Sequence, residues 1–372
     1  MKLTIERGAL LKALGHVQAV VEKRNTIPIL SNVLISAGPD GVSFAATDLD
    51  IEILEITEAT SDGEGLFTAP AHTLYDIARK LPDGADVTLE MSGSDPRISL
   101  KAGRSNFSLP SLPPGDFPVM PSEALEHRFT VSGADLVRLI DKTRFAISTE
   151  ETRYYLNGIH LHAAETDGRK TLRAVATDGV RLALSEINLP AGADGMPGVI
   201  VPRKTVQEVR RLLEDADDEV EVSVSEGKIR FKLGNATLTS KLIDGAFPDY
   251  ERVIPRGNTR TMSVENKRFA EAVDRVATIS VEKSRSVKLS LGSDSLTLAV
   301  NNPESGQAEE ELAVSYKDEG FAIGFNARYM LDVASQIEGD EALFHFADSA
   351  SPALVTDSGD ADALYVLMPL RV

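Results

Sequence analysis

The amino-acid sequence repeats itself three times, and this repeat constrains the fold more than any other feature. Residues 3–5, 129–131 and 262–264 each form a short apolar–polar alternation that leads into an amphipathic helical stretch, at offsets of 126 and 133 residues. A triplet Ala-Thr-Asp at 46–48 recurs at 176–178. Self-similarity at a long period is typical of chains built from repeated structural domains. The 372 residues therefore predict three domains of about 125 residues, with bounds at 1–121, 128–254 and 255–372.

Each predicted domain divides again into two smaller modules. In the first domain, three strand-like runs follow a helical stretch twice, and a turn signal at 38–41 separates two of these runs. The order strand, helix, strand, strand, strand is therefore expected six times along the chain, which gives an α+β fold class. Six helices are predicted, at residues 7–20, 72–80, 134–146, 203–214, 266–276 and 326–337.

The chain is acidic overall, yet its predicted helices are basic. The sequence holds 57 Asp and Glu against 39 Lys and Arg, a net charge of −18. The six helices carry fifteen Lys and Arg against eight Asp and Glu, which leaves −25 on the remaining residues. Lys and Arg favour helices, but Glu does as well, and Glu is scarce on these helices. We therefore interpret the helices as a cationic face for phosphate groups, with acidic sheets elsewhere.

Several classes of protein are disfavoured by what the sequence lacks. The chain has no cysteine, which excludes disulfides and thiolate chemistry and favours a cytoplasmic location. Charges at positions 6 and 7 do not fit a secretory signal, and no run approaches the ~18 apolar residues of a membrane helix. Phosphate-binding loop and nucleophile-elbow motifs are both missing. No catalytic residue and no cofactor are predicted, and an enzyme acting on carbohydrates or metabolites is disfavoured.

Two features resemble metal sites but are interpreted as structural. His160 and His162 alternate on one face of a strand with no third ligand in view, so half-buried strand histidines are favoured over a shared metal. The acidic run 357–362 lacks the Glu that a calcium loop requires at its twelfth position, so a solvated hairpin is favoured. Asp48 and Asp178 occupy matching places in two domains and are interpreted as turn residues at strand ends. No metal site is predicted.

Short motifs along the whole chain resemble those of one known family. The motifs are residues 1–7, Arg24 with 28–32, and residues 153–158, 176–182, 247–250, 301–304 and 368–371. In this order they make the chain similar to the bacterial DNA polymerase III sliding clamps, the β subunits of that polymerase. The resemblance implies a non-catalytic processivity subunit, in which two chains of three DNA-clamp domains join head to tail into a ring. An acidic, repeat-built protein-interaction scaffold without nucleic acid is the alternative left open.

The resemblance implies that helices line the hole of the ring and face duplex DNA, which agrees with the helix charge. Phosphate contacts need not read bases, so the ring could slide and hold the replicative polymerase near its template. The implied DNA contacts are Arg24, Tyr154, Tyr155, Arg203 and Lys204. The helix charge adds Arg79, Lys80, Lys142 and Arg210. Taken singly, each cation could be a solvated surface charge, and the tyrosine pair could belong to a strand core.

The resemblance also implies an apolar groove between the second and third domains, which takes short linear peptides from polymerases, the clamp loader and repair proteins. Flexible Met beside aliphatic residues suits a surface that accepts several sequences. Val180 stands where the family often has His, so the peptide preference could differ. Ordinary packing at the domain seam is the alternative. The matching positions are Arg153, Tyr155, Leu156, Thr177, Gly179, Arg181, Leu182, Pro248, Val253, Val366, Met368, Pro369, Leu370 and Arg371.

Ring closure is expected, from the same resemblance, at an edge strand of the first domain that carries Phe107 and Leu109. Its partner would be the third domain of the other chain, around Thr278 and Ile279. Unpaired strand edges invite pairing. Thr278 stands where better-known members have an aliphatic residue, so one apolar anchor is weakened. Charge could compensate through Arg104, which the family places near Glu304 and the acidic run 309–311.

Overall fold

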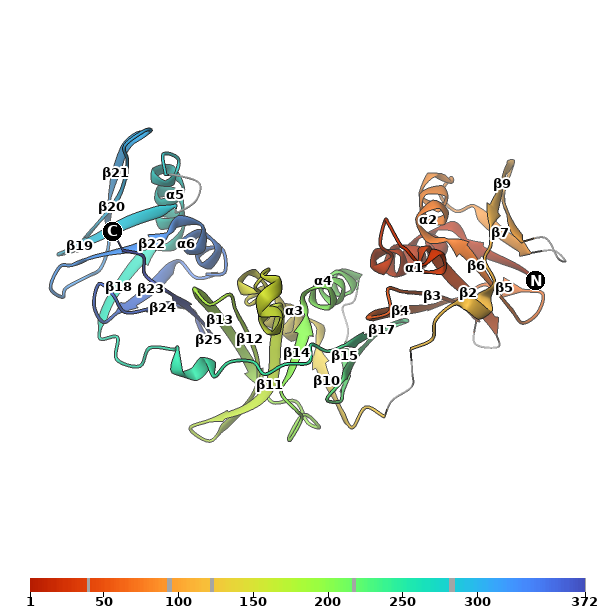
Figure 1. The fold of residues 1–372 in the computed structure, drawn as a ribbon, viewed down its shortest axis with the longest axis horizontal. Helices are drawn as coiled ribbons and strands as arrows, with labels where there is room; N and C mark the ends of the chain where they lie inside the picture. Colours follow the sequence, from red (N-terminus) through yellow and green to blue (C-terminus); the bar gives the residue numbers. More distant parts are fainter. Residues whose placement is uncertain (39–40, 92–95, 121–123, 216–218, 281–284, 372) are drawn as a thin grey trace. The chain divides into compact units, whose positions relative to one another are not determined.

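The computed structural model describes residues 1–38, 41–91, 96–120, 124–215, 219–280 and 285–371 (Figure 1). Within these residues the predicted module is present six times, each with its helix between the first and second strands. The first module contains β1 (Lys2–Glu6), α1 (Arg7–Val17), β2 (Asn32–Gly38), β3 (Gly41–Thr47) and β4 (Ile51–Thr57). After the two-residue strand β5 (Thr60–Ser61), the second contains β6 (Gly65–Pro70), α2 (Ala71–Lys80), β7 (Asp86–Met91), β8 (Arg97–Ala102) and β9 (Ser105–Pro110).

The other four modules follow the same order. The third contains β10 (His127–Ser132), α3 (Gly133–Asp141), β11 (Gly158–Thr166), β12 (Arg169–Thr177) and β13 (Arg181–Asn188). The fourth contains β14 (Val199–Pro202), α4 (Arg203–Leu212), β15 (Glu219–Val224), β16 (Lys228–Leu233) and β17 (Ala236–Lys241). The fifth contains β18 (Arg260–Glu265), α5 (Asn266–Ala277), β19 (Ser286–Gly292), β20 (Ser295–Asn302) and β21 (Gly306–Ala313). The sixth contains β22 (Ala322–Asn326), α6 (Ala327–Ala334), β23 (Glu341–Phe346), β24 (Ala353–Asp357) and β25 (Asp360–Leu367).

The start of the chain illustrates why these residues form these elements. Leu3 and Ile5 are buried on one face of β1, and the residues between and beside them are not. Glu6 caps α1, because its carboxylate accepts a hydrogen bond from the backbone amide of Ala9 at 3.1 Å. Helix α1 then buries Leu10 and other apolar residues of one face, each contributing roughly 1.5–3 kcal/mol relative to exposure.

Four predicted helices end earlier than the sequence indicates, and those predicted at 203–214 and 326–337 end at Leu212 and Ala334. The helix predicted at 7–20 ends at Val17 and continues as a 3-10 turn, Gln18–Val20. The helix predicted at 134–146 ends at Asp141, and a separate 3-10 turn follows at Arg144–Ala146. The hydroxyl of Thr143 donates to the carbonyl of Leu139 at 2.6 Å, and this kind of side-chain bond competes with a continuing helix.

The chain divides into two compact units, which are described separately. The N-terminal unit holds Met1–Ala134, Pro190–Met196 and Lys204–Leu242, and the C-terminal unit holds Asp135–Leu189, Pro197–Arg203 and Ile243–Val372. Helices α1 and α2 pack together in the first unit, as α5 and α6 do in the second (Figure 1). Among the described residues, no helix is long and apolar enough to span a membrane.

Sheet topology explains why the modules of the central repeat are shared between the two units. The N-terminal unit has a sheet β5-β1-β7-β8-β9 and an eight-stranded sheet β10-β15-β16-β17-β4-β3-β2-β6. The C-terminal unit has an eight-stranded sheet β14-β11-β12-β13-β25-β24-β23-β18 and a sheet β21-β20-β19-β22. We call the antiparallel pair β4–β17 the first seam, and the antiparallel pair β13–β25 the second seam. Each eight-stranded sheet therefore runs continuously across the boundary between two sequence repeats.

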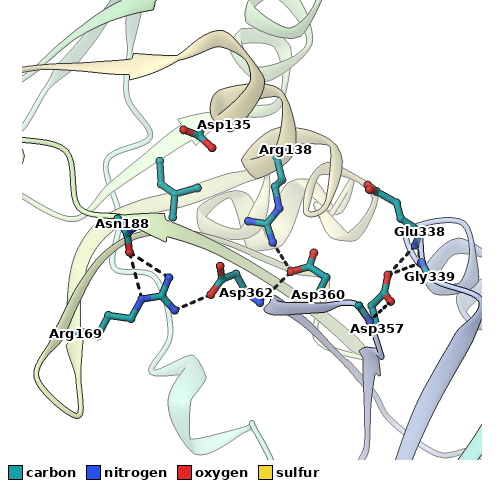
Figure 2. A pocket seen from close by; sticks show the side chains of 11 residues that line it. Asp135, Arg138, Arg169, Asn188, Glu338, Gly339, Asp357, Asp360 and Asp362 are labelled. Carbon is teal, nitrogen blue, oxygen red and sulfur yellow. Dashed lines mark hydrogen bonds and ion pairs between the residues drawn. The ribbon is translucent and has the colours of Figure 1, made fainter.

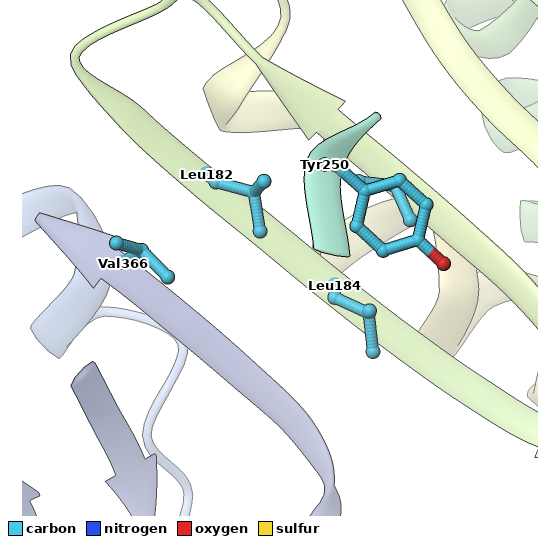
Figure 3. Packing of buried hydrophobic residues seen from close by; sticks show 5 residues of the cluster. Leu182, Leu184, Tyr250 and Val366 are labelled. Atoms are coloured by element: carbon cyan, nitrogen blue, oxygen red, sulfur yellow. The ribbon is translucent and has the colours of Figure 1, made fainter. Parts of the chain in front are cut away.

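The Pro-rich segments that end the first two repeats supply aromatic side chains to these sheets. Phe117 packs in a buried cluster with Ile29, Leu30 and Ala45, and Leu54 of β4 packs against this cluster at the first seam. The matching segment of the second repeat places Tyr250 over a cluster at the second seam (Figure 3). That cluster joins Val175, Leu182 and Leu184 to Val366 of β25. The linkers thus stabilise the seams as well as connect repeats.

Candidate functional site

The turn between β12 and β13 has a geometry fixed by its own side chains. The hydroxyl of Thr177 accepts from the amide of Gly179 at 3.1 Å and donates to the carbonyl of Arg181 at 2.7 Å. Asp178 Oδ1 accepts from the amides of Val180 and Arg181, both at 3.0 Å. Asp178 is therefore a turn residue, as the sequence predicted. Gly179 has φ +91°, a conformation that glycine adopts without strain, and a Cβ there would require the Arg153 guanidinium to move.

The C-terminal segment lies directly beside this turn. The amide of Met368 donates to the carbonyl of Val180 at 3.0 Å, and the amide of Leu370 donates to the carbonyl of Gly324 at 2.8 Å. Four large apolar side chains near the second seam remain exposed: Val180, Val253, Met368 and Leu370. We call these four residues the seam surface. Exposed apolar residues gathered around one seam are typical of a site that binds an apolar partner.

The predicted groove residues divide into a buried, a half-buried and an exposed set. Leu156, Thr177, Arg181, Leu182 and Val366 are buried. Arg153, Tyr155 and Pro369 are half-buried, and Gly179, Pro248, Val253, Met368, Leu370 and Arg371 are exposed. The structure brings residues 177–182 together with residues 366–370, which are far apart in the sequence.

Arg181 is only 8% exposed and ties three parts of the C-terminal unit together. Its guanidinium donates to Asp178 Oδ2 at 3.1 Å and to the carbonyl of Phe145 at 2.7 Å, and it also pairs with Asp332 on α6. The guanidinium lies 4.5 Å from the ring centroid of Tyr329. Arg181 therefore holds the turn from its buried side and does not form an exposed rim of the predicted groove.

Most of the predicted DNA contacts are exposed. Arg24, Arg79, Lys80 and Arg203 are exposed cations, and Arg79 lies 3.1 Å from Asp76 on its own helix. Tyr154 is exposed and meets Tyr155 edge-on at 5.8 Å between ring centroids. Both tyrosines lie in a 3-10 helix, Glu151–Leu156, so the alternative of a strand core is wrong.

Two predicted DNA contacts, Lys142 and Lys204, have partners within the chain itself. Lys142 is 4% exposed; its ammonium lies 2.7 Å from Glu338 and also donates to the carbonyl of Gln336. Lys204 donates to Asp48 Oδ2 at 2.6 Å. Burial lowers the pKa of Lys204, but its hydrogen bonds to Asp48 and Glu22 outweigh this effect and raise the pKa overall. Their placement argues against a role for either lysine as a DNA contact, and it could not be foreseen from helix charge alone.

Arg210 is intermediate between the exposed predicted DNA contacts and the two lysines that have partners within the chain. It is half-buried, and its guanidinium lies 3.6 Å from Glu214 one turn further along the chain. A pair at this spacing and exposure holds a side chain only weakly.

A polar cavity of about 680 Å³ opens where α3 approaches the hairpin between β24 and β25 (Figure 2). The hairpin carboxylates that line it have partners within the unit. Asp360 pairs with Arg138, and Asp362 lies 2.6 Å from Arg169. Asp357 Oδ2 accepts from the amides of Glu338 and Gly339 at 2.7 and 3.0 Å. Burial raises the pKa of Asp357, but these backbone hydrogen bonds outweigh it and hold the pKa below its usual value.

The expectation of a solvated hairpin at 357–362 is therefore wrong for its first carboxylate. Asp357 is buried because the loop after α6 folds its amides onto the carboxylate. The side chains that line the cavity connect two repeats. Arg138 and Arg169 of the second repeat form ion pairs with acids of the third repeat.

His160 and His162 have the structural role that the sequence favoured. Their rings stack at 4.4 Å between centroids, and His160 also stacks on Phe247 at 4.8 Å. His162 Nε2 lies 3.0 Å from the Tyr250 hydroxyl. Burial lowers the pKa of His160 to about 4 and that of His162 to about 3. Among the described residues, no group of three His, Cys, Asp or Glu is placed to hold a metal ion.

The residues predicted at the ring interface lie on or near two sheet edges. Strand β9 ends one sheet, with Phe107 exposed and Leu109 buried; Arg104, just before it, is exposed. Strand β21 ends another sheet. Thr278 and Glu304 are exposed, and Ile279 is half-buried.

One acid of the run 309–311 already has a partner on its own chain. Arg275 donates to both carboxylate oxygens of Glu310, at 3.0 and 2.6 Å. These hydrogen bonds from Arg275 hold the pKa of Glu310 below its usual value. Glu310 is therefore less suited than its neighbours to meet a cation from another chain.

Comparison with known proteins places the whole chain in one family. Models of the DNA polymerase III beta subunit match in three parts: the N-terminal domain at 1–121, the central domain at 130–249 and the C-terminal domain at 251–371. The beta sliding clamp of Caulobacter vibrioides is 64% identical over 372 residues, covering both chains completely.

Solved structures agree. A crystal structure of the C. crescentus beta sliding clamp matches with a TM-score of 0.98 at 64% identity, covering 100% of this chain and 99% of that one. The sliding clamp of Bartonella birtlesii bound to griselimycin matches with a TM-score of 0.97 at 50% identity, covering both chains fully. The chain therefore belongs to the DNA polymerase III beta subunit family, whose clamp fold and sliding-clamp function it shares.

Proposed function

We propose that two copies of this chain close head to tail into a ring around duplex DNA and thereby tether the replicative polymerase. The observation that carries this proposal is the repeated seam. In both seams the last strand of one repeat's first module pairs with the last strand of the next repeat's second module, as β4 with β17 and β13 with β25. By the same rule, β21 requires the last strand of a second module, and β9 requires the last strand of a first module.

Both of these strands lie at sheet edges in the described chain, and each ends a sheet that lacks its other half. The half sheets β22-β19-β20-β21 and β1-β7-β8-β9 together reproduce the eight-stranded pattern of each seam. An exposed strand edge is a template for pairing with another chain. Joining β21 of one chain to β9 of the other, twice, leaves neither edge open, which is what a closed ring of two chains requires.

The repeat also proposes a register for this interface. Asn302 accepts from the amide of Glu304 at 3.0 Å, as Asp178 does from Val180, so the turns correspond. Gln307 pairs across its hairpin with Asn301 as Leu182 does with Thr177. Transferred from the first two seams, this correspondence places Gln307 opposite Ser108 of the partner chain.

The same register places Ala308 opposite Phe107 and Glu311 opposite Arg104. An apolar contact and a charge pair would then stabilise the interface, with Thr278, Ile279, Leu109 and Glu304 around them. The exposed positions of Phe107, Arg104 and Glu311 support this arrangement.

We assign the DNA-facing surface to exposed residues of the predicted set. Phosphate contacts position a duplex without reading its sequence, which suits sliding. The assigned residues are Arg24, Arg79, Lys80, Tyr154 and Arg203, with Tyr155 and Arg210 as less exposed members. Lys142 and Lys204 are left out because acids and carbonyl groups of the chain engage their ammonium groups.

We further propose that the seam surface binds short linear peptides of the polymerase, the clamp loader and repair proteins. Its exposed Met and aliphatic side chains support this assignment, and a related sliding clamp binds griselimycin. A scaffold that binds no nucleic acid is not favoured, because the relatives are sliding clamps. The domain bounds 1–121, 128–254 and 255–372, a cytoplasmic location and the absence of a cofactor complete the proposal.

Loading on closed and opened DNA tests the ring directly. We expect the protein to stay on nicked circular duplex after loading and to leave when the circle is cut, because only topology retains it. In dilute solution the mass should be twice 40.1 kDa. Equal rates of loss from circular and linear DNA, or a monomer as the active species, would contradict the proposal.

A further inference from the structure

The first seam reproduces the main-chain framework of the second. The amide of Leu49 donates to the Thr47 hydroxyl at 3.0 Å, as Gly179 does to Thr177 at 3.1 Å. Asp48 Oδ1 accepts from the amides of Asp50 and Ile51 at 3.0 and 2.8 Å, as Asp178 does from its own turn. Both turns also have a residue in the left-handed backbone conformation at the same place, with φ +81° at Leu49 and +91° at Gly179.

The strand beside each turn is also held in the same way. The amide of Lys241, at the end of β17, donates to the carbonyl of Asp50 at 2.8 Å. The amide of Met368, just after β25, donates to the carbonyl of Val180 at 3.0 Å. Lys241 and Asp50 therefore occupy the places in the first seam that Met368 and Val180 occupy in the second.

The side chains at these matched places differ in kind. In the first seam, Lys241 Nζ lies 3.0 Å from Asp50 Oδ1, and both side chains are largely exposed, at 53% and 74%. In the second seam, Met368 and Val180 are apolar and exposed, at 39% and 41%. An ion pair stands where the second seam has two apolar side chains.

Leu49 adds a third difference. It carries a side chain in a left-handed backbone conformation, where the second seam has glycine and where a β-carbon is unfavourable. Glycine lets the Arg153 guanidinium lie against the second turn. Glu304 occupies the turn position in the third repeat that Asp50 occupies in the first and Val180 in the second. The third repeat therefore has an acid at this position, as the first repeat does.

We propose that the Asp50–Lys241 ion pair closes the first seam to apolar peptides, and that Val180 and Met368 make the second seam the binding one. This inference rests on the proposed peptide function of the seam surface. An apolar ligand on the first seam would have to displace water from two charges, and that desolvation opposes binding. An exposed ion pair adds little to folding stability, so exclusion is the larger effect of the pair. Specificity among related sites often comes from such an unfavourable element.

Titration calorimetry with griselimycin as the probe tests the proposal on the full-length chain. The parent should bind one griselimycin per chain, and V180D/M368K should lose it. The variant L49G/D50V/K241M copies the second seam onto the first and should bind two griselimycin molecules per chain. The control L49G/D50K/K241D keeps opposite charges at the seam and should still bind one.

The experiment distinguishes failure of the proposed peptide surface from failure of the proposed exclusion by charge. If the parent binds no griselimycin, or V180D/M368K still binds it, the proposed peptide surface is wrong and the inference loses its basis. If V180D/M368K loses binding but the folded L49G/D50V/K241M stays at one site, the exclusion by charge is overturned. A second site in the charge-swapped control overturns it as well. The double variant D50V/K241M, which removes both exposed charges and keeps Leu49, provides the same test if the triple variant does not fold.

Discussion

One engineered cysteine pair per chain should lock the ring with a disulfide at each of its two interfaces, because the interface register fixes which residues face each other. The chain has no cysteine, so the pair S108C/Q307C would introduce the only two thiols. In the register transferred from the two seams, these positions are directly opposite on antiparallel strands, about 4.5–5.5 Å apart between Cα atoms. A disulfide needs a Cα separation of about 4.4–6.8 Å, so the geometry is suitable.

The control pair S108C/E309C moves one thiol two residues along β21. That shift adds about 7 Å along the strand, which places the Cα atoms about 8 Å apart. A bridge at this distance would require backbone movement. Both pairs change exposed residues, so their effects on folding should be similar.

Mild oxidation followed by non-reducing electrophoresis should give a covalent two-chain species for S108C/Q307C and little for S108C/E309C. When oxidised after loading on nicked circular DNA, the first variant should remain bound through a high-salt wash and leave after reduction. Efficient cross-linking of the control pair instead would refute the transferred register. Cross-linking of neither pair would refute the pairing of β21 with β9.

Three further outcomes are expected. Lowering the pH from 7 to 5 should reduce the free energy of unfolding, since His160 and His162 have folded pKa values of about 4 and 3 against 6.5 unfolded and take up protons on unfolding. The loss should be about 2 kcal/mol per histidine, and H160F should lessen it when urea midpoints are compared at the two pH values. Replacing Arg24 and Arg203 by Ala should reduce the salt slope of DNA binding by about 2, whereas K142A should leave the slope unchanged and lower the melting temperature. Truncation after Leu367 should abolish polymerase stimulation and preserve the two-chain mass; dissociation of the chains would place residues 368–372 in the interface instead.

The repeat made the module order predictable because strand alternation and helix amphipathicity are local properties. Leu3 and Ile5 mark β1 without knowledge of any other part of the chain. The seams are different, because β13 pairs with a strand almost 180 residues away in the sequence. The residues around Leu182 and Val366 in the sequence do not specify that these two residues pair with each other. A strand that is apolar on both faces could pair with many other strands.

The motifs in the sequence predicted where the candidate site lies. They did not distinguish the buried residues that hold the site in place from the exposed residues that a ligand could contact. The motifs place Arg181 and Met368 in one groove, yet Arg181 is buried among acids and aromatic rings and Met368 is exposed. The spacing of Lys142 in the sequence carries a signal of its internal role. Lys142 lies four residues after Arg138, one residue past the end of α3, and both cations meet acids of the third repeat.

Several cations on or beside the helices are paired with groups of their own chain, and this pairing changes how the ring is expected to hold DNA. Lys142 and Lys204 meet acids of their own chain, and Arg211 donates to the carbonyls of Gly15 and His16 at 2.8 and 2.7 Å. The net positive charge of the helices therefore overstates what a duplex would meet. Each phosphate contact that is absent removes a share of the salt-dependent affinity, and a weak hold also lowers the barrier to sliding. We therefore expect weak binding to linear duplex together with long residence on circles, so the strength of the β21–β9 pairing, rather than charge, sets the lifetime of the clamp on DNA.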